Sequence, residues 1–380
     1  MMIDFLREIY AGKLDSARWE REWKQLHAEC KTFQMSPFVH RMLRDTGQTD
    51  RVPAPLLDAL KRDGEQVLFH NMLVKNETRQ VLAALDAAGI PAIPLKGVLF
   101  AERYFGHFGA RGTSDIDILV KPGDLERAAD CIRSIGFTQE DAHHSLHYHA
   151  EFGKPIPAIG ENMTVELHHN VIRKHTAAIG LDKLWLESAP LVWEGKTYAY
   201  CRELNFLHTF YVMCLHASKH MMLSLKNVMD VAHLLQRYSD RLDMRQLAAM
   251  AEQDRTRSKV EAALGAACRF FPELRDTIRP IRGKRIPLLD LELIRTEERG
   301  AKSMRYYAYI LLYPLLTMDS WRYRATHVKY MLLPPRDRIE RMIGEEAGRR
   351  DLPTLYWKLY SHRFRLWRSH RLRSAGRRLE

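Results

Sequence analysis

Residues 92–100 of the chain read AIPLKGVLF, and residues 110–120 read ARGTSDIDILV. Residues 115–120 form a short apolar run rich in Ile, Leu and Val, which predicts a β-strand. Aspartate is depleted in strands, so the presence of both Asp115 and Asp117 in one strand needs an explanation. Because side chains alternate across a strand, the two carboxylates share one face, while Ile116 and Ile118 share the other.

Two carboxylates about 7 Å apart on one face repel each other unless a cation lies between them. Hard oxygen ligands at this spacing suit Mg²⁺. The alternative is an edge strand with a solvated acidic face. The turn that precedes the strand favours the metal site.

That turn joins a short expected strand, residues 92–95, to an expected helix, residues 98–108, through Lys96 and Gly97. A strand–glycine–helix turn directs backbone N–H groups and a helix N-terminus at an anion. Gly97 allows the backbone to approach a phosphate closely, and Lys96 supplies a positive charge. Alone, a Lys-Gly pair is usually only a turn. Followed by the Asp-x-Asp strand, it predicts a phosphate-binding turn facing a metal site.

Leu95-Lys96-Gly97, Arg111 and the run from Ser114 to Val120 resemble the uncharacterised nucleotidyltransferase-like family of the DNA polymerase β superfamily. Members of that superfamily have a Gly-Gly or Gly-Ser turn, an Asp-x-Asp strand and a third carboxylate on a later strand. This chain has Lys-Gly at the turn and a long connection, residues 98–114, before the strand. Both departures agree with the uncharacterised subfamily.

The third carboxylate should lie on a strand after the next expected helix, residues 122–135. Residues 163–167 are β-like, with Val165 and Leu167 facing one way and Glu166 and His168 the other. Glu166 is therefore the expected third carboxylate. The alternative is an exposed glutamate on a half-buried strand.

A second group of polar residues, His216, Lys219 and His220, occupies an otherwise apolar helical stretch at positions i, i+3 and i+4, which share one helix face. This run and the following Asp230 also resemble the family, so the resemblance covers about residues 60–335. The two histidines could bind a metal, or all three side chains could contact phosphate, base or acceptor, with Asp230 orienting one of them. The alternative is a helix face whose polar groups are satisfied internally.

The composition is that of a globular protein. A chain of 380 residues with 46% hydrophobic residues has room for two or three globular domains. The N-terminal residues do not resemble a signal peptide, and no apolar run reaches membrane-spanning length. Five scattered cysteines indicate reduced thiols in the cytoplasm. The spacing of His143, His144, His147 and His149 is too loose to predict a zinc site.

The net charge is +12, and the last twenty residues, with seven arginines and one glutamate, contribute half of this excess. Such a tail can attract RNA, anionic lipid or a nucleotide, or it can act only as a solubilising tail. Residues 352–373 could form a basic amphipathic helix, on a membrane surface, a partner or the protein's own core.

We expect an α+β fold in which a small mixed β-sheet nucleotidyltransferase core is flanked by N-terminal and C-terminal helical regions. The expected divisions are an N-terminal helical region at 1–90, the α/β core at 91–200, a helical region at 201–335 and a basic tail at 336–380. We also expect the N-terminal region to pack beside the sheet.

The resemblance implies transfer of a nucleoside monophosphate from an NTP, with ATP the expected donor, to an acceptor hydroxyl, releasing pyrophosphate. Asp115 and Asp117 would hold two Mg²⁺ ions, and Glu166 would complete the acceptor-side metal or act as the base. The β- and γ-phosphates would be held by Lys96, Gly97 and Ser114. Arg111 would neutralise charge in the transition state or fix the loop through an internal carboxylate.

A different class remains open, namely a catalytically weak or silent module of the same fold that binds nucleotide or RNA. Within the enzyme class, the sequence leaves the acceptor open among a small molecule, a glycan precursor, a peptide, a protein side chain and tRNA. The basic tail is a candidate contact for an anionic partner.

Overall fold

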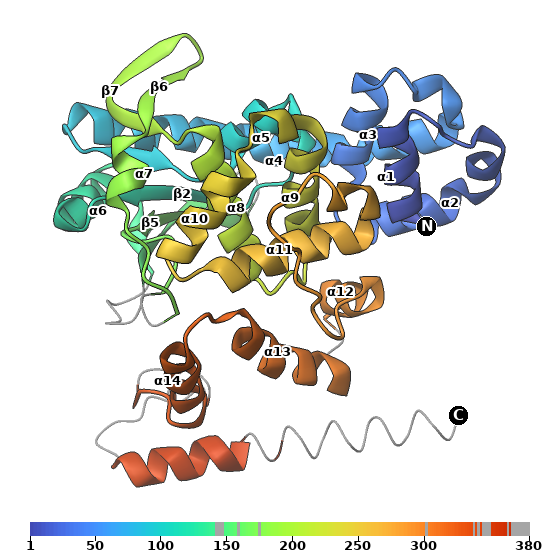
Figure 1. Cartoon of the computed structure of the whole chain (residues 1–380). Coiled ribbons are helices and arrows are strands. Elements are labelled where there is room, and N and C mark those ends of the chain that lie inside the picture. Colours follow the sequence, from blue (N-terminus) through green and yellow to red (C-terminus); the bar gives the residue numbers. More distant parts are fainter. Residues whose placement is uncertain are drawn as a thin grey trace. The chain divides into compact units, whose positions relative to one another are not determined.

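The structure is a computed structural model that describes residues 1–140, 148–157, 160–173, 176–300, 303–336, 339, 343, 351–362 and 365. It divides into two compact units, residues 1–319 and residues 320–380 (Figure 1). The expected α+β class is confirmed, since a seven-stranded mixed sheet is combined with many helices. The four-part division expected from the sequence stays a prediction.

The sheet lies in the first unit and consists of β1 (Ala92–Pro94), β2 (Asp115–Val120), β3 (Thr138–Gln139), β4 (His149–Ile156), β5 (Glu161–His168), β6 (Ala189–Trp193) and β7 (Lys196–Glu203). The strand order is β3-β4-β5-β2-β1-β7-β6. Strand β2 pairs antiparallel with β1 and parallel with β5. The β2–β5 register places Asp117 directly beside Glu166.

Helices cover both faces of this sheet. Ile116 and Ile118 point to one face, where they pack with α4 (Ala54–Ala87) and α6 (Leu125–Ser134). On the opposite face Leu119 packs with residues of α7 (Asp182–Leu186) and α8 (Phe206–Lys219). Asp115 and Asp117 lie on this second face, so the alternation of side chains along β2 directs both carboxylates toward α8.

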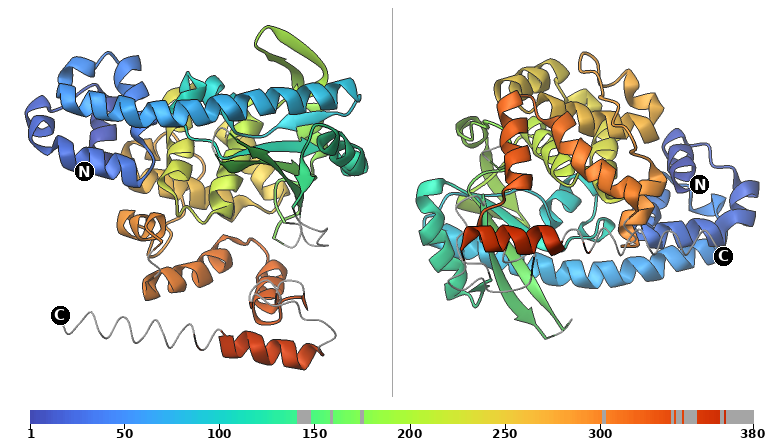
Figure 2. Two further views of the ribbon diagram at one scale, coloured as in Figure 1. Left: turned by 180° about the vertical axis from the view of Figure 1, so that it is seen from behind. Right: turned by 90° about the horizontal axis from the view of Figure 1, so that it is seen from below.

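Helix α4 links the sheet to the N-terminal helices α1 (Met2–Ala11), α2 (Ser16–Thr32) and α3 (Ser36–Asp45). Its 34 residues make it about 50 Å long. Leu56 and Leu60, near its start, pack with the N-terminal helices, whereas Val81 and Leu85 pack on the sheet. Figure 2 shows α4 running from these helices across the sheet.

The remaining helices of this unit are α5 (Val98–Phe105), α9 (Leu225–Tyr238), α10 (Met244–Gln253), α11 (Arg257–Phe270), α12 (Leu291–Glu298) and α13 (Met304–Thr317). All of them share one apolar core with α8 and with α1–α3, and α5 also contributes Val98 and Leu99 to the core under the sheet. Tyr10 Oη lies 2.7 Å from His233 Nδ1, and the Phe38 ring lies against the same imidazole. The expectation that the N-terminal region packs beside the sheet therefore holds for α4 and is wrong for α1–α3.

The second unit contains α14 (Trp321–Leu332) and a helical stretch at residues 352–362. Its small core is formed by Ile339, Leu355 and Leu359. No helix in the described part of the chain is long and apolar enough to cross a membrane. Three of the four histidines in the 143–149 cluster (143, 144 and 147) and six of the seven tail arginines, all but the one at 365, lie outside the described residues.

The connection between Gly97 and Asp115 is held by a fully buried side chain on α4. Asn71 Nδ2 donates to Phe108 O at 2.6 Å and to Arg111 O at 2.8 Å. Its Oδ1 accepts from Thr113 N at 3.2 Å. This one amide therefore satisfies three backbone groups of the loop that leads into β2.

We predict that Asn71→Ala lowers the free energy of unfolding by about 3 kcal/mol, because it leaves buried backbone donors and acceptors unpaired. Chemical denaturation measures the change. Asn76→Ala is the matched control, since Asn76 is exposed on the same helix and should change stability by less than about 0.5 kcal/mol. Equal effects of the two substitutions would show that Asn71 does not hold the loop.

Candidate active site

The turn between β1 and α5 places a lysine next to the acidic strand. Leu95 N donates to Asp117 O at 3.0 Å, which keeps the turn beside β2. Gly97 precedes α5 with φ 84° and ψ −148°, a conformation that only glycine adopts without strain. Lys96 is thereby held against the face of β2 that carries the aspartates.

Lys96 forms ion pairs with both aspartates. Its Nζ lies 2.8 Å from Asp115 Oδ2 and 2.9 Å from Asp117 Oδ2. Burial alone would lower the pKa of Lys96, but the charges of Asp117 and Asp115 outweigh burial and raise it. Ser114 Oγ donates to Asp115 Oδ1 at 3.0 Å. The lysine expected to contact phosphate thus lies between the two expected metal ligands.

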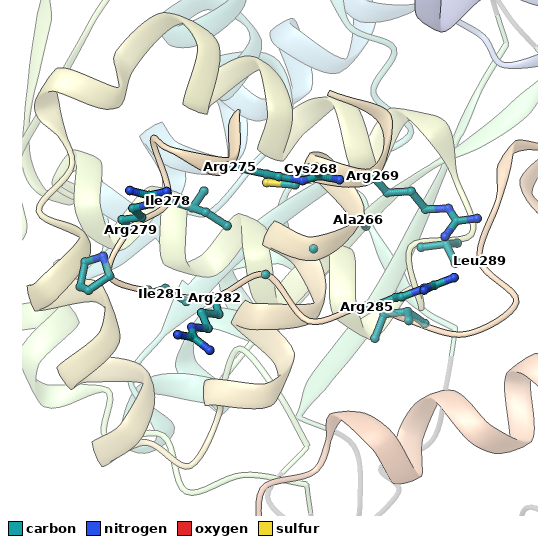
Figure 3. A pocket seen from close by; sticks show the side chains of 14 residues that line it. Ala266, Cys268, Arg269, Arg275, Ile278, Arg279, Ile281, Arg282, Arg285 and Leu289 are labelled. Atoms are coloured by element: carbon teal, nitrogen blue, oxygen red, sulfur yellow. The ribbon is translucent and has the colours of Figure 1, made fainter. Parts of the chain in front are cut away.

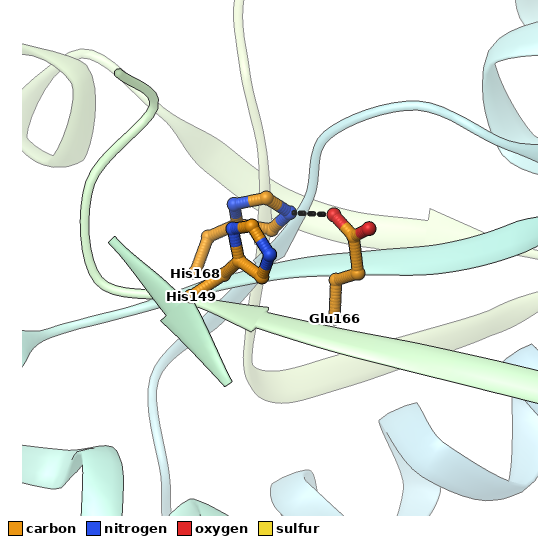
Figure 4. Close-up of side chains that lie close together, drawn as sticks. All are labelled: His149, Glu166 and His168. Carbon is orange, nitrogen blue, oxygen red and sulfur yellow. Dashed lines mark ion pairs between the residues drawn. The ribbon is translucent and has the colours of Figure 1, made fainter. Parts of the chain in front are cut away.

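A histidine on β5 contacts the other side of the acidic group. His168 Nε2 lies 3.0 Å from Asp117 Oδ1 and 3.0 Å from Glu166 Oε2, the second contact being drawn in Figure 4. Burial would lower the pKa of His168, but its hydrogen bonds with Asp117 and Glu166 raise it. Burial would likewise raise the pKa of Glu166, but His168 lowers it to about 2.

Two overlapping sets of side chains have the spacing of metal ligands. Asp115, Asp117 and Glu166 each offer a carboxylate oxygen, and these atoms lie within 4.8 Å of one another. Glu166 and His168 form a second set with His149, whose ring lies 5.1 Å from that of His168 (Figure 4). The all-oxygen set suits Mg²⁺, whereas the set with two imidazoles suits transition metals.

A cavity of about 250 Å³ opens in front of this acidic group. It is lined by Lys96, Gly97, Arg111, Thr113, Ser114, Asp115, Glu166, His216, Lys219, His220, Ser224, Lys226 and Asn227. Nine of the expected site residues therefore meet in one place, and the tenth, Asp117, is buried directly behind Lys96.

Burial and the charge of Lys96 hold the pKa of His216 well below its usual value, so its imidazole is neutral at pH 7.

Arg111 and Asp230 form a buried bidentate ion pair at the edge of the cavity. Arg111 Nε donates to Asp230 Oδ1 at 2.6 Å, and Nη2 donates to Oδ2 at 2.7 Å. Of the two roles expected for Arg111, this geometry matches the fixing of the loop through an internal carboxylate. Asp230 was expected to orient His216, Lys219 or His220, and the structure pairs it with Arg111 instead.

A family model described as uncharacterised nucleotidyltransferase matches residues 20–272, about two thirds of the chain. The chain belongs to the uncharacterised nucleotidyltransferase family. The resemblance seen in the sequence is thereby confirmed. No curated protein and no solved structure matches the chain significantly.

Two charged residues of this candidate site, His168 and Lys226, have no role in the expectations from the sequence. Alternation along the strand places His168 on the same face as Glu166, and this shared face is the signal that points to it. Lys226 lies one helical turn before Asp230 in α9, on the same side of the helix. Burial, together with the charge of Arg111, lowers the pKa of Lys226 to about 8.

We predict that Asp230→Asn destabilises the protein by about 3–5 kcal/mol, because it leaves the Arg111 guanidinium buried without a counter-charge. Asp130→Asn is the matched control, since Asp130 is 76% exposed and its pair with Arg133 should contribute less than about 1 kcal/mol. Denaturant unfolding compares both variants with the wild type. If Asp230→Asn cost no more than the control, the pair would not be what fixes the loop.

Proposed function

We propose that the protein is a Mg²⁺-dependent nucleotidyltransferase of the polymerase β superfamily type that transfers NMP from an NTP, with ATP the expected donor, to an acceptor hydroxyl. The acceptor oxygen forms a bond to the α-phosphorus, the bond from the α-phosphorus to the β-phosphate oxygen breaks, and pyrophosphate leaves. The single observation that carries this proposal is the meeting of three carboxylates from β2 and β5 with a cavity lined by cations.

The donor set fits a hard divalent cation. Asp115, Asp117 and Glu166 contribute only oxygen atoms and lie close enough together to share an ion. When bound there, Mg²⁺ lowers the pKa of the acceptor hydroxyl and offsets charge at the α-phosphate. Lys96 and His168 contact the same carboxylates until then, which keeps the ligand set assembled.

Lys96 has two alternative sets of partners in this proposal. Without nucleotide its ammonium balances Asp115 and Asp117. A triphosphate entering the cavity would offer negatively charged oxygen atoms to the same side chain, which lines the cavity. Lys96 then moves from the carboxylates to the phosphates, which releases the carboxylates to act as ligands.

Of the two roles considered for Glu166, that of metal ligand is supported over that of general base. A general base works best when its pKa lies near the operating pH. His168 instead lowers the pKa of Glu166 to about 2, so Glu166 binds a proton too weakly at neutral pH to remove one from a hydroxyl. A permanently ionised carboxylate is well suited to hold a cation.

The size and charge of the cavity support binding of the phosphate end of the nucleotide. Its volume of about 250 Å³ is below the 300–1,000 Å³ typical of pockets that enclose whole ligands, so the base and sugar would extend outward. Lys219 and Lys226 line it from the end of α8 and the start of α9. A phosphate beside Lys226 would restore the full charge that burial reduces.

A second candidate function is a catalytically weak or silent module that binds nucleotide or RNA. The observation that favours it is the internal neutralisation of the carboxylates by Lys96 and His168, since such a group is stable without metal. Nucleotide binding that does not depend on Mg²⁺ would support this alternative. The proposed acceptor is still one of a small molecule, a glycan precursor, a peptide, a protein side chain and tRNA. The proposed location is the cytoplasm, which would supply both NTP and Mg²⁺.

The reaction is tested by incubating the protein with Mg²⁺, α-labelled NTPs and cell extract. We expect label to enter an acceptor with wild-type protein, and Asp117→Asn to reduce this by about a thousandfold, because several kcal/mol of charge stabilisation is lost. Asp130→Asn is the matched surface control and should transfer normally. Normal Mg²⁺-dependent transfer by Asp117→Asn would show that the site is wrongly assigned.

The switch of Lys96 is tested separately with Lys96→Met. We expect NTP affinity to fall by roughly ten- to a hundredfold, the effect of losing one charged hydrogen bond. We also expect Mg²⁺ to raise the melting temperature of this variant more than that of the wild type, because no ammonium competes for the carboxylates.

Lys61→Met removes an exposed lysine of α4 and serves as the control. Unchanged NTP affinity in Lys96→Met, together with a fall in melting temperature that Mg²⁺ does not reverse, would make Lys96 a purely structural residue.

A further inference from the structure

A large hollow lies away from the proposed nucleotidyltransferase site. It has a volume of about 920 Å³ and lies between the C-terminal half of α11 and the segment at residues 275–289 (Figure 3). Five of its lining residues are arginines, namely Arg269, Arg275, Arg279, Arg282 and Arg285. We call it the arginine hollow. It shares no lining residue with the cavity in front of Asp115.

The arginine hollow carries a positive charge that is only partly balanced by nearby carboxylates. All five arginines are exposed, and no aspartate or glutamate is among its lining residues. Arg279 pairs with Asp276, and both of those side chains are about 80% or more exposed to solvent, so the pair is weak. Among the described residues, the other four arginines form no ion pair within 4.0 Å.

The backbone of the surrounding segment is fixed by close contact with α11. A Cβ added at Gly265 would lie 2.0 Å from Lys284 O, and one added at Gly283 would lie 2.8 Å from Gly265 Cα. Lys284 N also donates to Glu261 O at 2.7 Å. Buried isoleucines at 278, 281 and 286 alternate with the arginines and anchor the segment. The arginines are therefore carried by a backbone segment that packs closely against α11.

We propose that the arginine hollow binds the phosphodiester backbone of a double-helical nucleic acid. Guanidinium groups match phosphate oxygens bidentately, and several of them neutralise phosphates along a strand. A compact hollow of this volume is roughly 10 Å across, and a duplex presents about one charge per 1.7 Å of its axis. Several phosphates therefore fall within reach of the five arginines.

The lining also argues against other anions. Single-stranded nucleic acid is held by stacking of bases on aromatic side chains, and no Phe, Tyr or Trp lines the arginine hollow. Pockets for small anions enclose most of the ligand and place a few polar groups around it, whereas these arginines are all exposed. A display of exposed positive charge without base-reading groups matches binding to the backbone of a duplex.

The arginine hollow and the catalytic cavity lie near opposite ends of α9. Lys226, at the start of α9, lines the catalytic cavity, and Gln236, near its end, contacts Glu273 at 3.2 Å, two residues before Arg275. Ten helical residues separate them, which corresponds to about 15 Å. The proposed binding does not depend on nucleotidyl transfer, and its readout is binding alone.

The test measures binding of a short fluorescein-labelled RNA duplex to the full chain by anisotropy over a range of salt concentrations. We expect Arg279→Gln/Arg282→Gln/Arg285→Gln to weaken binding about tenfold or more and to reduce the slope of log K against log salt by about 2–3, since each phosphate contact contributes about 0.9. The matched control, Arg21→Gln/Arg51→Gln/Arg62→Gln, removes the same charge from exposed arginines on other elements and should change the slope little.

A DNA duplex of the same sequence forms a second arm and distinguishes RNA from DNA as the source of the backbone. Melting temperatures confirm that both triple variants are folded. The proposal is overturned if the control triple variant weakens binding as much as the triple variant of the arginine hollow, because binding then depends on the total charge of the protein and not on this site. It is equally overturned if tripolyphosphate, poly-glutamate or phosphatidylserine vesicles occupy the arginine hollow more tightly than either duplex.

Discussion

The ion pairs between Lys96 and the aspartates of β2 are the interaction on which the site depends. Two carboxylates on one strand face, with a third beside them on β5, would repel each other strongly if nothing balanced them. Lys96 approaches from the glycine turn and His168 from β5, so the three carboxylates are met by one ammonium and by an imidazole whose pKa they raise. The three carboxylates are therefore held close together, and in the proposed function an external cation would replace the ammonium between them.

Support for this group comes from parts of the chain that are distant in sequence. Asn71 on α4 binds the backbone of the loop before β2, and Asp230 on α9 pairs with Arg111 in the same loop. The loop is thus held from both sides by buried polar contacts, which cost a great deal to break. This explains how a long connection between Gly97 and Asp115 can still present Asp115 and Asp117 in a fixed geometry.

The sequence predicted β2 with its observed bounds, because a short run of branched residues between turns has few alternatives. Glu166 could be chosen because alternation along its strand is strict, and the parallel register then places it beside Asp117. The pairing of Asp230 with Arg111 could not be predicted, since nothing in the sequence tells how α9 is placed against the loop. The same limit explains why α1–α3 were expected beside the sheet, although Tyr10 of α1 and Phe38 of α3 pack against His233 of α9.

The most direct test of the account is a structure of the protein with Mn²⁺ and a non-hydrolysable NTP, in which anomalous scattering locates the metal. The account predicts manganese between Asp115, Asp117 and Glu166, with the ammonium of Lys96 moved to the phosphates. Nucleotide bound in the cavity with Lys96 still between the aspartates, and no metal beside them, would contradict it.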